Sequence, residues 1–275
     1  MIELILDAFS FAFMIRAFVV GIAVAISGSF LGSFLVLRRY AMIGHGLAHI
    51  SFGAVAIALF LGQTPLLVTL PIVIAASLLI LYMSENSNIG GDTAIGLLSS
   101  FAIALATLLS SLRGGFGTDL NSYLFGSILF LTNVDVILSV VVALLVIGMV
   151  YVFYDELFAS TFDEMYARVN RVNIKTINRL LAILTAVTVT IGIQSIGVLL
   201  IASMIIFPTI ISLQFRQGFQ RTILLAVGFS IVVVFFGILS SYVFNLPTGS
   251  TIVMLSAITL VIAYWGNRLV KGADA

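Results

Sequence analysis

Residues 16–37 read RAFVVGIAVAISGSFLGSFLVL, an apolar run that is followed at once by Arg38 and Arg39. A helix of about 20 apolar residues is long enough to cross the roughly 30 Å hydrocarbon layer of a bilayer. The run therefore predicts a membrane-spanning helix. Residues 1–14 read as a short amphipathic lead-in without the basic start and small-residue cleavage site of a signal peptide.

The rest of the chain repeats this pattern. Hydrophobic residues make up 61% of the 275 and charged residues only 8%, a composition typical of an integral membrane protein. Runs of this length favour helices over the shorter strands of a β-barrel. We therefore predict an all-α, polytopic helical membrane protein, one domain over 1–275, with about eight transmembrane helices (seven to nine). Further spans are expected at about 42–62, 66–83, 93–112, 134–153, 178–213, 221–243 and 249–266.

One of these runs, 178–213, is too long for a single span. It either breaks near Gln194 to Gly197 into two helices, or is one span followed by a shorter piece that ends near Pro208. The segment SYLFGSILFL (122–131) is too short to cross, so we expect it to be re-entrant or interfacial at the outer mouth.

The positions of Lys and Arg in the short loops predict the orientation, because these residues collect on the cytoplasmic side. On this rule the N-terminus lies outside and the C-terminus in the cytoplasm, with Arg113 as the one outer-loop cation. The cytoplasmic set is Arg38, Arg39, Arg168, Arg171, Lys175, Arg179, Arg216, Arg221, Arg268 and Lys271.

Several function classes are disfavoured by composition. The net charge of +1 gives no basic surface for nucleic acid, and the lack of cysteine excludes disulfides and thiolate metal sites. No G-x-x-x-x-G-K-[S/T] motif occurs. We therefore expect no enzyme in this chain, and any ATP must be hydrolysed by a separate subunit.

The charged stretch 154–179 is the one substantial segment outside the spans. Thr161 to Glu164 match a capping box, so a helix is expected over about 161–170, with Asn170 in the left-handed turn that stops it. This helix is either an amphipathic connector on the membrane surface or a coupling helix that docks on a cytoplasmic ATPase partner. Its candidate coupling residues are Phe162, Asp163, Glu164, Met165, Tyr166 and Val169.

The only two histidines, His45 and His49, are four residues apart in IGHGLAHI (43–50). On a helix this spacing puts both imidazoles on one face, about 5–6 Å apart at Cβ, which suits two ligands of one metal. No Asp or Glu is expected in the interior of a span, and titratable groups in a membrane are functional by default. Gly53 and Ala56 extend the same face, which is a candidate pore lining. The plain alternative is that each imidazole bonds a carbonyl of a neighbouring helix.

Two neutral imidazoles do not complete a tetrahedral zinc site. A two-fold homodimer with this helix at its axis brings four histidines together, a nitrogen set that suits zinc better than manganese. A zinc protease is disfavoured because Gly46 stands where H-E-x-x-H needs its general base, whereas a proton relay remains open. Asp119 is the one carboxylate at the expected outer mouth. It is either a residue of metal capture or an ordinary solvated loop residue.

Four motifs in order resemble the membrane permeases of bacterial ABC importers for divalent metals. They are GSFLVLRRYAMIGHGLAHISFGAVAIAL (32–59), TDLNSYLFGSIL (118–129), TFDEMYARVNRVN (161–173) and GVLLIASMIIFPTI (197–210). In that family the segment after the paired arginines usually reads Gly-Asp-x-x-x-His, with the Asp and His facing the translocation path. His49 matches the family's histidine, whereas His45 stands in the place of its aspartate.

The resemblance implies a permease homodimer in a bacterial cell membrane. Its partners are cytoplasmic ATP-binding subunits and an extracellular or periplasmic metal-binding protein. The metal is then a transported substrate, and no tightly bound cofactor is expected. We interpret the chain as the permease of a zinc importer that uses His45 and His49. The alternatives are manganese or iron import by the same type of complex, and an ATP-independent proton-coupled metal carrier.

Overall fold

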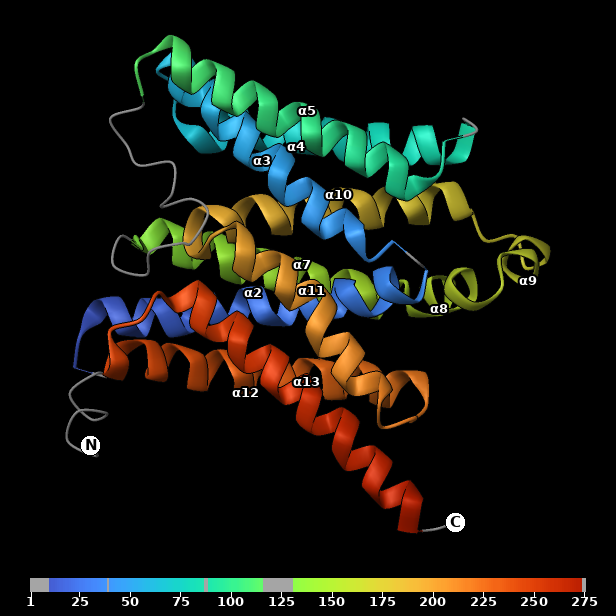
Figure 1. Cartoon of the computed structure of the whole chain (residues 1–275). Helices are drawn as coiled ribbons and strands as arrows, with labels where there is room; N and C mark the ends of the chain where they lie inside the picture. The colour runs from blue at the N-terminus through green and yellow to red at the C-terminus, as the bar shows by residue number, and fades with distance from the viewer. Residues whose placement is uncertain (1–9, 39, 87–88, 116–130, 274–275) are drawn as a thin grey trace.

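The computed structural model describes residues 10–38, 40–86, 89–115 and 131–273, and Figure 1 shows the whole chain. The residues described contain helices and no strand, which confirms the predicted fold class. The helices are α2 (Ala12–Leu37), α3 (Met42–Leu61), α4 (Pro65–Asn86), α5 (Gly91–Leu112), α7 (Asn133–Val152), α8 (Tyr154–Phe162), α9 (Glu164–Val169), α10 (Ile174–Ile196), α11 (Val198–Leu213), α12 (Phe219–Phe244) and α13 (Thr248–Ala273).

Eight of these helices are long and apolar enough to cross a membrane, namely α2, α3, α4, α5, α7, α10, α12 and α13. The predicted number of about eight is thereby confirmed within the described residues. The long run breaks at Gly197, whose φ of 90° and ψ of 163° lie in a region open essentially to glycine alone. The shorter α11 follows and continues through Pro208 to Leu213, so the alternative of an end near Pro208 is wrong.

Three groups of helices make up the bundle (Figure 1). Helices α3, α4 and α5 pack together, α11, α12 and α13 form a second group, and α2, α7 and α10 lie between them. Most of the spanning windows of α2, α3 and α10 are buried, whereas α5 and α13 are mostly exposed. The chain thus places the segment with both histidines, α3, among its most buried helices.

Small residues let α2 and α11 approach closely. A Cβ added at Gly32 would lie 2.0 Å from the carbonyl oxygen of Ile205, and one added at Gly28 would lie 3.4 Å from the Cβ of Met204. The Gly28-x-x-x-Gly32 stripe is therefore a helix-packing surface, as is common in membrane bundles. Ile205 also packs closely on α3, because its Cδ1 atom would lie 2.5 Å from a Cβ added at Gly44.

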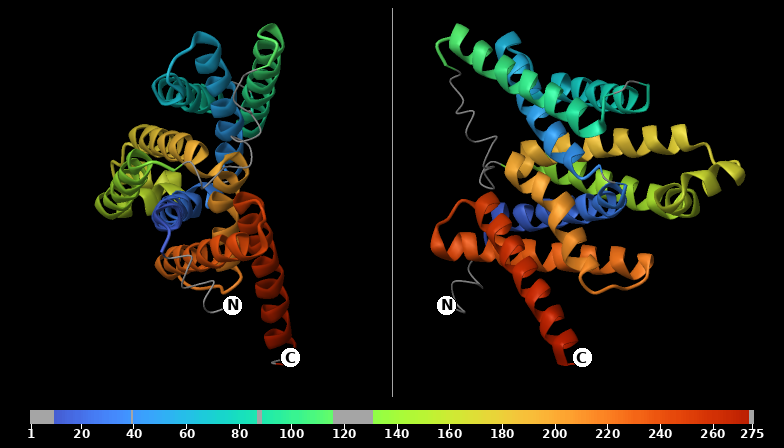
Figure 2. Two further views of the ribbon diagram at one scale, coloured as in Figure 1. Left: turned by 90° about the vertical axis from the view of Figure 1, so that its left-hand side faces the viewer. Right: turned by 45° about the vertical axis from the view of Figure 1, so that its right-hand side comes forward.

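Helix α13 diverges from the bundle, as both views of Figure 2 show. Its large side chains Met254, Val261 and Ile262 are more than half exposed. Exposed apolar side chains also line α5, among them Phe101 and Leu108. In a membrane such surfaces face lipid or another apolar helix.

Candidate metal path and coupling surface

The two histidines lie in the first turns of α3 and contact each other. Their Nε2 atoms are 3.1 Å apart, and the rings meet edge to face with centroids 4.5 Å apart. One Nε2 donates and the other accepts, according to the tautomer. Among the residues described the two rings contact each other, and neither has a carbonyl partner there.

The histidine face of α3 lies between two helix contacts. A Cβ added at Gly44 would meet Ile205 of α11, and one added at Gly46 would meet Ile95 of α5. His45 and His49 occupy the face between these contacts and are half-buried. Farther along the same helix, a Cβ at Gly53 would lie 2.7 Å from the carbonyl oxygen of Ala102 of α5.

The prediction that Gly53 and Ala56 extend a pore lining is therefore wrong for this chain alone. Gly53 is a point of close packing on α5, and Ala56 is fully buried. The helical spacing placed these residues near the histidine face correctly, but the approach of α5 closes that part of it. The accessible part of the face is thus confined to the turns that carry the imidazoles.

The geometry of the pair fits two ligands of one metal ion. Two nitrogens held at about 2.0–2.1 Å by a tetrahedral zinc ion lie about 3.3 Å apart, close to the separation of the two Nε2 atoms. The described residues hold no group of three or more His, Cys, Asp and Glu side chains that could bind a metal. A tetrahedral ion held by these two nitrogens would need two further ligands from outside this part of the chain.

Asp119 and nearly all of the segment 122–131 lie outside the described residues. Arg16, near the start of α2, donates from Nη1 to the carbonyl oxygen of Leu131 at 3.0 Å, which ties α2 to the residues before α7. Arg16 therefore has a structural partner of its own.

The coupling segment consists of two short helices, α8 and α9, at one end of the bundle (Figure 1). The predicted capping box is wrong, because the helix cap is Asp163, whose carboxylate accepts from the amide of Tyr166 at 3.0 Å. Thr161 instead lies in the last turn of α8, where its hydroxyl donates to the Leu157 carbonyl at 2.6 Å. The left-handed residue that follows α9 is Arg171, with a φ of 59°, and not Asn170.

Three of the four residues of the predicted apolar stripe lie on α9 and are open to solvent, whereas the fourth, Phe162, is the last residue of α8. Met165 and Val169 are 80% and 82% exposed, and Tyr166 and Phe162 are also exposed. Glu164 lies off this stripe and pairs with Arg168 at 3.8 Å. An exposed stripe of this kind on a helix outside the spans is suited to a protein partner.

Sequence reasoning missed the apolar joint that continues this surface. Phe158 and Phe162 of α8 both pack on Phe219 at the start of α12, with ring centroids 5.4 and 5.3 Å apart. Beside this joint lies an open cavity of about 480 Å³, lined by Tyr154, Asp155, Phe158, Gly218, Phe219, Gln220 and Arg221. Its residues come from segments about 60 positions apart, so local periodicity could not reveal it.

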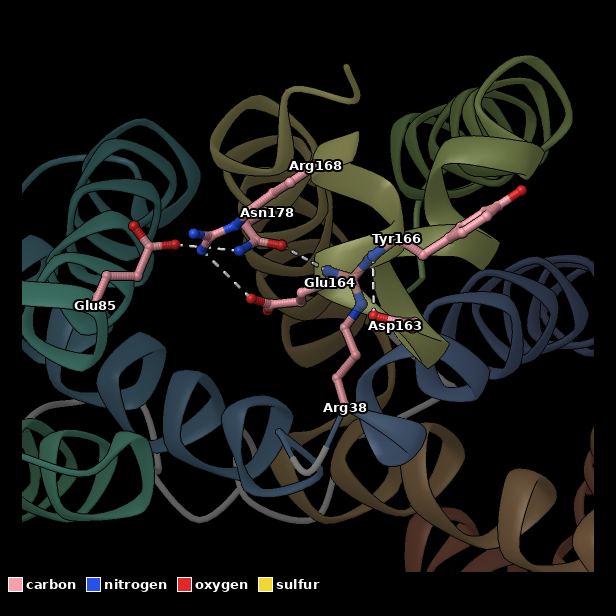
Figure 3. A network of polar contacts seen from close by, with 7 residues as sticks. All are labelled: Arg38, Glu85, Asp163, Glu164, Tyr166, Arg168 and Asn178. Carbon is pink, nitrogen blue, oxygen red and sulfur yellow. Dashed lines mark hydrogen bonds and ion pairs between the residues drawn. The ribbon is translucent and has the colours of Figure 1, made fainter. Parts of the chain in front are cut away.

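Arg38, treated in the sequence only as a loop cation, is also part of this end of the bundle. Its Nε donates to Thr161 Oγ1 at 2.9 Å. Its Nη1 donates to Asn178 Oδ1 at 2.6 Å (Figure 3). Its Nη2 donates to the Leu157 carbonyl and to Ser160 Oγ. Burial lowers the pKa of Arg38 to about 10, and the nearby Glu164 and Tyr40 oppose this shift. The guanidinium therefore stays charged at neutral pH and needs these partners.

Comparison with known proteins agrees with this architecture. Residues 10–267 match the ABC 3 transport family. A manganese transport system membrane protein of Listeria innocua is 32% identical over 255 residues, which cover 92% of this chain and 90% of the relative. The manganese import system permease protein ScaB of Streptococcus gordonii is 29% identical and covers 96% of this chain and 94% of the relative.

Solved structures give the same result. That of PsaBC from Streptococcus pneumoniae in complex with Fab is 29% identical, with a TM-score of 0.84 over 96% of this chain and 95% of that one. A putative metal-chelate type ABC transporter in an inward-facing conformation shares the fold at a TM-score of 0.71 and 16% identity. Because the family match and the relatives span almost the whole length, this multi-pass membrane chain belongs to the ABC 3 transport family.

Proposed function

We propose that this permease of a metal ABC importer carries zinc, and that His45 and His49 from each of two copies form the site where the ion pauses during transport. The observation that carries the proposal is the Nε2 to Nε2 distance of 3.1 Å on a half-buried face of α3. Two copies supply four neutral nitrogens, a complete tetrahedral set. Such a site need not bind tightly, because transport requires release.

The donor atoms favour zinc over a harder ion. Imidazole nitrogen suits zinc, whereas carboxylate and carbonyl oxygens suit manganese. His45 replaces a carboxylate that the resemblance leads us to expect at that position, and so removes the oxygen donor from each copy. The histidine face lies between α5 and α11, and α13 packs on α11. A second copy packed along the exposed side chains of α5 and α13 would therefore cover that face.

The described cations support a cytoplasmic position for one end of the bundle. Seven of them lie in or beside helix ends at the end of the bundle that carries α8 and α9 (Figure 1). They are Arg38, Arg168, Arg171, Lys175, Arg179, Arg216 and Arg221. The positive-inside rule makes this end cytoplasmic. The exposed stripe of α9 and the cavity beside Phe219 then face the cytoplasm, where ATP-binding subunits dock. A metal-binding protein delivers the ion at the opposite end, for which Asp119 stays a candidate capture residue.

Manganese import by the same type of complex is the second candidate. It is favoured by the names of the two relatives given above, both of which are described as manganese transport proteins. Iron stays an alternative of the same kind. Membership of an ABC transport family argues against an ATP-independent proton-coupled carrier.

Zinc accumulation tests the site directly. The permease is expressed with its ATP-binding subunits and metal-binding protein in a bacterial strain without its own zinc importer, and uptake of radioactive zinc is normalised to permease in the membrane fraction. We expect the double variant His45→Ala, His49→Ala to lose most uptake. Uptake at the parental rate would refute the central site, and no zinc uptake by the parent would refute zinc as the substrate.

Competition between zinc and manganese tests the role of His45. The variant His45→Asp restores an oxygen donor, so we expect its uptake to shift toward manganese when both ions are supplied. Its matched partner, His45→Asn, adds an amide of similar shape without a negative charge and should not produce the same shift. An unchanged ion preference in His45→Asp would show that this position does not select the metal.

A further inference from the structure

Arg38 stands where three parts of the bundle meet. It is the residue directly after α2, and the first turn of α3, with His45, begins a few residues later. Its guanidinium contacts the last turn of α8 at Thr161. It also contacts the first turns of α10 at Asn178 (Figure 3). Arg38 therefore lies in the chain segment that leads into α3, and its side chain bonds to α8 and α10.

The network continues into α4 on the far side of Arg38. The Nδ2 atom of Asn178 donates to Glu85 Oε1 at 3.1 Å, and Glu85 lies in the last turn of α4 (Figure 3). The neighbouring Ser84 is 2.9 Å from the hydroxyl of Tyr40, which lies in the α2–α3 connection. The connection before α3 is thus held from both sides, by Arg38 toward α8 and α10 and by Tyr40 toward α4.

The chemistry of the contact makes it stiff and directional. Arg38 uses its planar fork to donate to three side-chain oxygens, two of them in the last turn of α8, and to the Leu157 carbonyl within that helix. Helices α8 and α9 meet at Asp163, directly after the turn that Arg38 holds. Through this contact a displacement of α9 would reach Arg38, directly before the connection to α3.

We propose that Arg38 is a positioning residue that couples movement of the α8–α9 segment to the first turn of α3, and so links ATP hydrolysis to the state of the histidine site. The proposal rests on the proposed function, in which ATP-binding subunits dock on α9. It adds an assignment for a residue that contacts neither the metal nor the partner. Its signature is a change in efficiency, that is, in the number of ATP molecules hydrolysed per ion moved.

The test is made on the whole complex in proteoliposomes, with metal uptake and phosphate release measured on the same sample. Arg38→Lys keeps the charge but presents a point donor in place of the fork, and Arg38→Met removes the charge. We expect both variants to hydrolyse ATP while moving less zinc, with ATP used per ion raised by about tenfold, within the range of ordinary coupling between sites. The matched control is Arg179→Lys, an exposed cation nearby on α10 that should leave the ratio unchanged.

A merely structural role gives a different result. It would lower the amount of intact complex, so that ATPase activity and uptake fall together and their ratio holds. A ratio within about twofold of the parent in both Arg38 variants would overturn the proposal. No zinc uptake by the parent complex would instead refute the proposed function.

Milder variants decide the matter if both Arg38 variants fail to fold. Thr161→Val and Asn178→Leu each remove one acceptor of the guanidinium while keeping the arginine. Each should raise the number of ATP molecules used per ion by about threefold. This is less than the change expected of the Arg38 variants, because the other hydrogen bonds of the guanidinium remain. Parental ratios in both of these variants would likewise overturn the proposal.

Discussion

Replacement of Gly32 by alanine should separate α2 from α11, whereas the same change one turn earlier, at Gly28, should not. The added Cβ at Gly32 would lie 2.0 Å from the carbonyl oxygen of Ile205 and 2.8 Å from its carbonyl carbon. These are backbone atoms, so no side-chain rotation relieves the clash. At Gly28 the nearest atom is the Cβ of Met204 at 3.4 Å, an ordinary van der Waals contact.

The magnitude follows from the missing space. A carbon atom rests about 3.3–3.6 Å from a carbonyl oxygen, so α11 has to move by more than about 1 Å at this point. Overpacking of this kind costs about 1–3 kcal/mol, and the better helix propensity of alanine returns up to about 1 kcal/mol in either variant. We therefore expect Gly32→Ala to be less stable than Gly28→Ala by about 2 kcal/mol, or roughly 4–6 °C in Tm for a chain of this size.

The assay is thermal unfolding of the purified permease in one detergent, followed by size-exclusion chromatography after heating. Zinc uptake should fall with stability in Gly32→Ala, because Ile205 also contacts the Gly44 position directly before His45. Equal melting temperatures for the two variants would refute the close approach of α2 and α11 and the packing argument built on it.

Three further variants test other parts of the structure. Gly197→Ala puts a side chain at a φ of 90° in the break before α11 and should cost about 2 kcal/mol in thermal unfolding, whereas Gly148→Ala in α7, with open space around it, should be neutral or stabilising. The double variant Met165→Asp, Val169→Asp places two charges on the exposed face of α9 and should abolish co-purification of the ATP-binding subunits. The control Tyr151→Ser, on the exposed side of α7, should keep them. Subunits retained by the double variant would exclude α9 as the docking helix. The chain has no native cysteine, so a single introduced cysteine can be cross-linked selectively. A short bismaleimide should join Met42→Cys, near the histidine pair, into a dimer in membranes, whereas the more exposed Tyr151→Cys should stay monomeric. The reverse result would place the dimer axis elsewhere.

The spans and their order could be predicted because the bilayer imposes a length and a composition on each helix. The His45 and His49 pair could be placed on one face for a similar reason, since the spacing of four residues fixes it. The limit of this reasoning is visible at Gly53, which shares that helix and is buried against Ala102 of α5. A helical pattern tells which residues lie on one face, but only the packing of the neighbouring helices tells how far along the helix that face stays open.

The coupling segment shows a second limit, the competition for one hydroxyl group. Thr161 matches the pattern of a helix cap, yet in the structure its side chain bonds the Leu157 carbonyl and accepts from Arg38, more than 100 positions away in sequence. Asp163 then provides the cap, and α9 begins later than the local pattern predicts. The distant arginine thus donates to the oxygen that the local pattern assigns to the helix cap. The contact that takes Thr161 out of the predicted cap is also the one through which, in our proposal, Arg38 couples the α8–α9 segment to the start of α3.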